Sequence, residues 1–189
     1  MIKNFKASKD ISPRAILLFG FLFATALFIV CVFVRPESLG HNDGLSYFGA
    51  VWWTVVPYTI AFLTYALCCL IASKKITQNS NSAKIIKKFL ILMAIMLLGL
   101  TVTPHTVINS VHKVFGSTLF ASQLILSLYL LYTNGKNYWI FVLVIVMFTS
   151  GIFSAAFLTS ASGFMIQAQI IYQIAFILIL SHYLGRKNI

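Results

Sequence analysis

The chain has 189 residues, of which 60% are hydrophobic and only 9% are charged. Soluble domains carry about 25% charged residues, so this composition excludes a water-soluble globular protein. The formal net charge of +11 belongs mainly to segments at one predicted membrane face. We therefore expect membrane lipids, and no nucleic acid, among the partners.

Long apolar segments fill most of the chain. About 20 apolar residues form a helix that spans a hydrocarbon core of roughly 30 Å. The pattern predicts an all-α, polytopic membrane protein in which transmembrane helices form one bundle and one domain over residues 1–189. The six predicted helices cover about residues 15–34, 49–73, 89–107, 108–132, 138–159 and 164–184.

The first predicted helix has clear start and stop signals. Ser12 supplies a capping oxygen, and Pro13 is tolerated at the first helical position because its missing N–H has no partner there. Arg35-Pro36 ends the helix, and the loop that follows is rich in turn-forming residues. The apolar run exceeds the core of a secretory signal peptide, about 7–15 residues, and no cleavage motif follows it. We therefore expect a retained anchor.

The later connections are short. Lys74–Lys88 is a polar link whose centre, Gln78–Ser82, is predicted to be flexible. Pro57 is expected to bend the second helix, and Pro104 to disturb the end of the third. Asn134-Gly135 predicts a tight turn between the fourth and fifth helices. None of these links is long enough to hold a second domain.

The orientation follows from the distribution of lysine and arginine, because cytoplasmic segments carry most of these residues. If both termini are cytoplasmic, the opposite side holds only Arg35 and Lys113. The predicted cytoplasmic side then holds Lys3, Lys6, Lys9, Arg14, Lys74, Lys75, Lys84, Lys87, Lys88, Lys136, Arg186 and Lys187. We predict cytoplasmic N- and C-termini in a multi-pass protein of the plasma or inner membrane.

Several kinds of chemistry have no support in the sequence. Cys31, Cys68 and Cys69 all lie in apolar segments, so we expect no disulfide framework. No acidic or basic residue lies at mid-depth in a predicted helix, which argues against a proton pump or a voltage sensor. Haem needs facing axial ligands, and His182 lies far from the other histidines, so we expect no cofactor.

Polar residues of chemical interest gather at the predicted outer face. The first outer loop holds His41 and Asp43, and the ends of the third and fourth helices bring His105, Asn109 and His112. Imidazole and carboxylate groups act as acid and base near neutral pH, so the candidate catalytic residues are His41, Asp43, His105 and His112. No pair among them has a recognised metal-ligand spacing, and we predict no metal. Two other interpretations of these residues remain. They could form a pH-sensitive binding patch, or they could lie there only because outer loops hold the polar residues of a membrane protein.

The sixth predicted helix carries a polar face. Gln169 and Gln173 lie four residues apart and point into the bundle, because an amide group that faces lipid loses its hydrogen bonds. They are predicted to line a polar cavity that opens outward, and interhelical hydrogen bonding is the alternative interpretation. The predicted ligand-binding residues are Asn109, His112, Gln123, Gln169, Tyr172 and Gln173.

Two short pieces of the sequence carry a resemblance to a known family. They are the loop Arg35–Gly49, RPESLGHNDGLSYFG, and the helix start Val111–Gly116, VHKVFG. In these pieces and in its layout the chain resembles an uncharacterised prokaryotic family of six-helix integral membrane proteins, and more distantly the FRAG/DRAM/Sfk-type membrane proteins. The resemblance implies a lipid-facing protein with a structured first outer loop, and implies no reaction. The late-helix histidine pairs of transmembrane zinc hydrolases are missing, which argues against that class.

Three functions remain as hypotheses. The first is non-enzymatic binding of a lipid, a small amphiphile or another membrane protein through an outward-facing polar pocket. The second is a membrane-embedded enzyme that acts on a lipid headgroup at the outer His/Asp residues. The third is a transporter of a neutral solute, which needs no charge inside the membrane.

Overall fold

The computed structural model describes residues 11–41, 43–103, 106–133, 137–157 and 163–185. For residues 155–157 it describes the backbone only. Every regular element within them is a helix, so the predicted all-α class is confirmed. The α-helices are α1 (Pro13–Val34), α2 (Tyr47–Ala50), α3 (Trp52–Lys75), α4 (Asn81–Val102), α5 (Asn109–Thr133), α6 (Tyr138–Phe157) and α7 (Met165–Leu184). Two 3₁₀ turns, η1 (Pro36–Gly40) and η2 (Gly44–Ser46), lie between α1 and α2.

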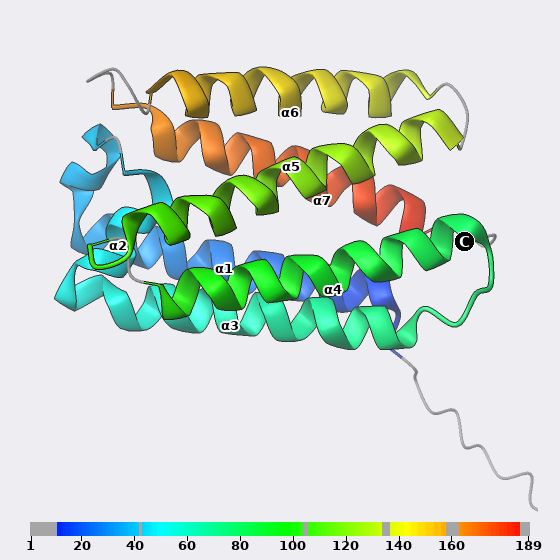
Figure 1. The fold of residues 1–189 in the computed structure, drawn as a ribbon, viewed down its shortest axis with the longest axis horizontal. Coiled ribbons are helices and arrows are strands. Elements are labelled where there is room, and N and C mark those ends of the chain that lie inside the picture. The colour runs from blue at the N-terminus through cyan, green and yellow to red at the C-terminus, as the bar shows by residue number, and fades with distance from the viewer. Residues whose placement is uncertain (1–10, 42, 104–105, 134–136, 158–162, 186–189) are drawn as a thin grey trace, which may run out of the picture.

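The long helices lie side by side along one common direction (Figure 1). We call the end that holds η1, η2 and α2 the loop end, and the end that holds the α3–α4 link the lysine end. Successive long helices run in opposite directions, so α1 begins and α7 finishes at the lysine end (Figure 1). The two helices meet there, because Arg14 Nε donates a hydrogen bond of 3.1 Å to Ser181 Oγ.

The start of α1 follows the predicted capping pattern. Ser12 Oγ accepts a hydrogen bond of 3.2 Å from the backbone N–H of Ala15, and Pro13 is the first helical residue. This arrangement satisfies one of the donors that a helix start leaves without a partner. The helix ends at Val34, before the Arg35-Pro36 pair, as the sequence indicates.

Two predicted boundaries differ from the structure. The segment predicted over 49–73 is divided, because Val51 adopts an extended conformation between α2 and α3. The prediction of a flexible centre in the Lys74–Lys88 link was wrong at its second half, since α4 begins at Asn81 rather than at residue 89. Ser80 Oγ caps this start by accepting a hydrogen bond of 3.1 Å from the N–H of Ala83. The helix then ends at Val102, five residues before the longer predicted limit of 107.

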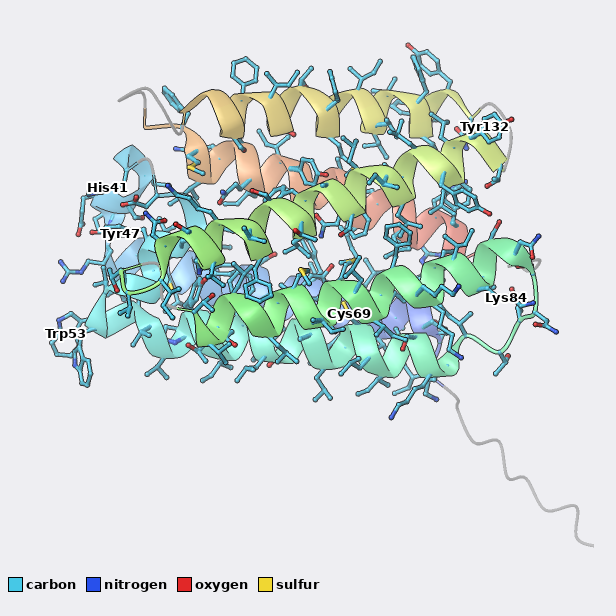
Figure 2. All side chains as sticks on the ribbon, in the orientation of Figure 1. His41, Tyr47, Trp53, Cys69, Lys84 and Tyr132 are labelled. Carbon is cyan, nitrogen blue, oxygen red and sulfur yellow. The ribbon has the colours of Figure 1, made fainter. Side chains whose placement is uncertain are left out.

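Five helices, α1, α3, α4, α5 and α7, are long and apolar enough to cross a membrane, and α6 has a shorter apolar stretch, Tyr138–Ser154. The molecule is therefore a helical, multi-pass membrane protein. Its outer surface carries many exposed apolar side chains, as expected for helices that face lipid. Exposed aromatic residues lie at both ends, with Trp53 at the loop end and Tyr132 at the lysine end (Figure 2). Aromatic side chains in these positions are typical of the two membrane interfaces.

The helices do not pack evenly. The most extensive contacts join α1 to α3, α3 to α4 and α6 to α7, while α1 touches α7 much less. At Gly20 of α1 the neighbouring helix comes so close that an added Cβ would lie 2.7 Å from Cβ of Cys68. Small residues permit such close approach of helices in lipid. The contacts of α5 with α6 and α7 are also few, and a space remains among these helices inside the bundle at the loop end.

Candidate functional site

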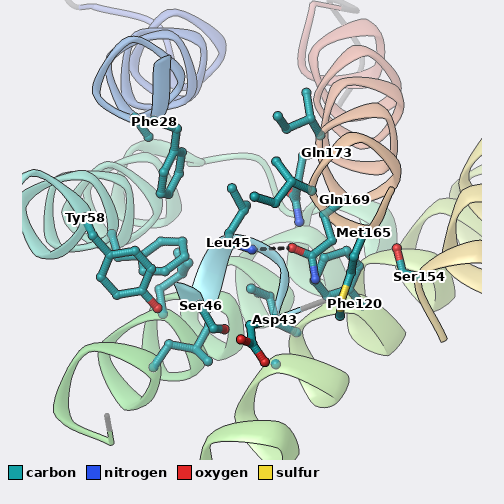
Figure 3. Close-up of a pocket in the computed structure, with 18 of the residues that line it drawn as sticks. Phe28, Asp43, Leu45, Ser46, Tyr58, Phe120, Ser154, Met165, Gln169 and Gln173 are labelled. Atoms are coloured by element: carbon teal, nitrogen blue, oxygen red, sulfur yellow. Dashed lines mark hydrogen bonds between the residues drawn. The ribbon is translucent and has the colours of Figure 1, made fainter. Parts of the chain in front are cut away.

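A cavity of about 710 Å³ occupies this space (Figure 3). Its walls come from α1, α3, α4, α5, α6 and α7, and the loop between α1 and α2 contributes its rim. On α1 the lining extends from Phe21 to Phe33, which corresponds to about 18 Å along the helix at 1.5 Å per residue. The cavity therefore reaches from the loop end through about half of a hydrocarbon core of roughly 30 Å.

The deep part of the cavity is apolar and aromatic. Phe28, Tyr58 and Phe62 form one wall in which the ring centroids of Phe28 and Phe62 lie 5.4 Å apart, and those of Tyr58 and Phe62 lie 4.7 Å apart. Leu97 of α4 and Phe120 of α5 also line this part, together with the polar side chains of Thr25 and Gln173. These centroid separations lie in the range of favourable aromatic pairs, so the three side chains form one packed wall.

The rim at the loop end is polar. Asp43 and Lys113 contribute charges of opposite sign, and Asn109 and Ser46 contribute neutral polar groups. Asp43, Asn109 and Lys113 are exposed, so the cavity opens at this end. The site thus changes from charged at its rim to apolar at its base.

Gln169, one of the predicted ligand residues, fastens the loop to α7. Its Oε1 accepts a hydrogen bond of 2.9 Å from the backbone N–H of Leu45 (Figure 3). Gly44 makes this contact possible, because it has φ +60 and a Cβ there would lie 2.6 Å from the Gln169 amide nitrogen. On the same helix, Gln167 Nε2 donates to the carbonyl of Leu39 at 3.3 Å. These bonds give the first loop a defined position over the cavity.

Gln123 and Gln173 form a reciprocal amide pair between α5 and α7. Gln123 Nε2 donates to Gln173 Oε1 at 3.1 Å, and Gln173 Nε2 donates to Gln123 Oε1 at 3.0 Å. Gln123 is fully buried, whereas Gln173 also lines the cavity. Beside them, Tyr172 donates its hydroxyl hydrogen to the carbonyl of Phe120 at 2.5 Å. The interhelical hydrogen bonds expected as the alternative role of these residues are therefore present.

His112 connects three parts of the loop end. Its Nδ1 lies 2.6 Å from the carbonyl oxygen of Thr103, and its Nε2 lies 2.7 Å from Ser46 Oγ. A carbonyl oxygen only accepts, so Nδ1 carries the hydrogen and a neutral ring accepts at Nε2 from the serine hydroxyl. The side chain is buried, and it ties the end of α4 and the loop to α5.

The candidate catalytic residues are brought together only in part. Asp43 and His112 both line the cavity, whereas His41 is exposed and stacks on Tyr47 with ring centroids 4.5 Å apart. His105 lies outside the described residues. Among the residues that the model describes, no group of three histidine, cysteine, aspartate or glutamate side chains could hold a metal ion.

The predicted ligand residues fall into two groups. Asn109, His112, Gln169 and Gln173 line the cavity, whereas Gln123 and Tyr172 lie behind it and contact residues that do. Sequence reasoning missed Lys113 and the aromatic wall as parts of the site. Lys113 had a usable signal, since it is one of two basic residues on the predicted outer side. The aromatic residues had none, because lipid-facing helices carry the same side chains.

No family model, curated protein or solved structure matches the chain, so the resemblance drawn from the first loop and the start of α5 stays a prediction.

Proposed function

We propose that this protein is a non-enzymatic lipid-binding protein of the plasma or inner membrane, and that the cavity holds one lipid or amphiphile chain. The observation that carries the proposal is the change in character along the cavity, from a charged rim to an apolar, aromatic base. An amphiphile has the same order of groups, with a polar head and an apolar tail. The volume of about 710 Å³ also falls within the range of about 300–1,000 Å³ that is usual for small-molecule sites.

The proposal includes six membrane crossings. Helix α6 is one of them, and its described apolar stretch, Tyr138–Ser154, is shorter than the other five helices. An even number of crossings agrees with the contact between Arg14 and Ser181, which joins the start of α1 to the end of α7. The lysine end carries Lys74, Lys75, Lys84, Lys87 and Lys88, so it faces the cytoplasm. The loop end and the rim of the cavity then face the opposite side.

The topology is tested by labelling. Reporter tags placed at the two chain termini should be accessible from the cytoplasm only. A cysteine introduced at exposed Trp53, on a background without the native cysteines, should react with a membrane-impermeant reagent from the other side. Termini in opposite compartments would refute the even number of crossings.

The binding function is tested by filling the cavity. Ile170 of α7 lines the cavity, whereas Ile174, one turn further along, is 42% exposed on the outside and is absent from the lining. Ile170→Trp should expel the bound chain, and Ile174→Trp should not. The measurement is the amount of lipid that copurifies with gently solubilised full-length protein, determined by mass spectrometry. Equal amounts of lipid in the two variants, or none in the native protein, would overturn the proposal.

A further inference from the structure

We propose that the ligand of the cavity is a zwitterionic phospholipid, taken up sideways from the membrane leaflet at the loop end. This inference rests on the proposed lipid-binding function and names the class of lipid. Two observations carry it: the charges at the rim and an opening of the cavity toward the surrounding lipid.

The charges at the loop end divide into two pairs. Apart from histidine, the two sequence segments at the loop end, residues 35–51 and 103–113, carry four charged residues: Arg35, Glu37, Asp43 and Lys113. Arg35 Nη1 and Glu37 Oε1 form an ion pair at 3.3 Å, away from the cavity lining. Asp43 and Lys113 are the two that line the cavity. The rim of the cavity therefore includes one acidic and one basic side chain.

A zwitterionic headgroup is the chemical complement of this rim. Its phosphate carries a negative charge that pairs with the Lys113 ammonium, and its amine carries a positive charge that pairs with the Asp43 carboxylate. An anionic phospholipid offers the first partner but not the second. A diacylglycerol offers neither, although its chains would fill the same apolar base.

The cavity also reaches the lipid-facing surface of α1. Ile29 and Phe33 belong to the lining, yet they are 51% and 82% exposed. On the opposite side of the cavity α7 contributes Ile166 and Ile170, and Figure 3 shows Phe28 of α1 facing Gln173 of α7 across the space. The opening toward lipid that these residues mark lies between α1 and α7.

This opening is bounded at both ends. Arg14 and Ser181 join α1 to α7 at the lysine end. At the loop end Gln169 holds the loop that follows α1, through the N–H of Leu45. The two fastenings keep the helices in place while the middle stays open. One chain of a phospholipid can lie in the cavity, and the other can remain in the membrane against Ile29 and Phe33.

The test is competition between lipids that share their chains and differ in their headgroups. Full-length protein in a mild non-ionic detergent is given equal amounts of phosphatidylethanolamine, phosphatidylglycerol and diacylglycerol, and the bound species are counted by native mass spectrometry. We expect phosphatidylethanolamine to exceed phosphatidylglycerol by about two- to fivefold, the range for one exposed ion pair. Asp43→Asn should abolish that difference. Lys113→Ala should reduce the preference of both phospholipids over diacylglycerol, and Lys84→Ala, at the lysine end (Figure 2), should change nothing.

The outcomes separate this inference from the function on which it rests. If the native protein retains lipids without a headgroup preference, the zwitterionic assignment fails and lipid binding stands. Retention of none of the three lipids would remove the proposed function itself. Lys113 lies on a regular, exposed turn of α5, so its alanine variant folds even if a change at Asp43 disturbs the loop. A Lys113→Ala protein with native selectivity would therefore also refute the inference.

Discussion

The reciprocal amide pair between Gln123 and Gln173 makes an unequal prediction for its two partners. In the Gln173→Leu variant the Gln123 amide loses its hydrogen-bond partner. Because Gln123 has no exposed surface, water cannot take the place of that partner. Gln123→Leu leaves the Gln173 amide at the cavity, where a water molecule or a polar ligand group can reach it. We therefore expect Gln173→Leu to be the more destabilising of the two single changes.

The size of the effect follows from the two hydrogen bonds. Interhelical hydrogen bonds in membranes contribute about 0.6 kcal/mol each on average, so the pair contributes about 1 kcal/mol. A buried polar group left without a partner costs about 1–3 kcal/mol more. We expect Gln173→Leu to lower the free energy of unfolding by about 2–4 kcal/mol, and Gln123→Leu by about 1–2 kcal/mol. The double variant strands no amide and should be no worse than Gln173→Leu alone.

The assay is a double-mutant cycle measured by reversible denaturation in mixed detergent micelles. The control is Gln167→Leu, which removes the same type of side chain from the same helix but only one peripheral bond of 3.3 Å to the Leu39 carbonyl. This control should lower the free energy of unfolding by less than either pair variant. Additive effects of the two pair variants would refute the reasoning, because they would mean that the amides do not depend on each other.

Three further substitutions follow from close contacts in the same bundle. Gly44→Ala places a side chain at a residue with positive φ and against the Gln169 amide of α7, so it should lower the free energy of unfolding by about 1–3 kcal/mol. The control is Gly40→Ala, which has open space around it and should be nearly neutral in thermal unfolding. Gly20→Ala brings a Cβ to 2.7 Å from Cys68 Cβ and should lower the free energy of unfolding by about 1–3 kcal/mol in the same denaturation assay; an unchanged value would refute the close packing of α1 on α3 at this point. His112→Phe keeps an aromatic ring in place but loses the hydrogen bonds to Ser46 and to the Thr103 carbonyl. A protease should therefore cut the first loop faster in this variant than in the native protein. An unchanged cleavage rate would mean that the histidine does not hold the loop.

The course of the chain was largely predictable because length and hydropathy decide where a helix can cross a membrane. Ser12 and Pro13 give the start of α1 correctly, since capping is a local interaction that the sequence displays directly. The start of α4 was missed for a related reason. The polar residues after Lys75 were interpreted together as a flexible link, although Ser80 was a capping signal three residues before Ala83.

The site was less predictable because its residues act through partners on other helices. Gln169 and Gln173 have the spacing of a cavity-lining face, and both do line the cavity. Their amide groups, however, bind the N–H of Leu45 and the amide of Gln123, which come from distant parts of the chain. No local pattern reveals such partners. The same applies to His112, whose residue type favoured a catalytic role but whose ring connects α4, α5 and the first loop.

The size of the cavity bears directly on what fills it. An enclosed empty space in a protein core is destabilising, and this cavity opens to its surroundings, so molecules from outside can enter and fill it. Water finds few polar partners along the aromatic wall, although it can reach the Gln173 amide on the opposite side. A lipid chain needs no such partners, and the surrounding bilayer would supply one at the exposed side chains Ile29 and Phe33. Under the proposed function, a lipid chain in the cavity would pack against Phe28, Phe62 and Phe120, which line it.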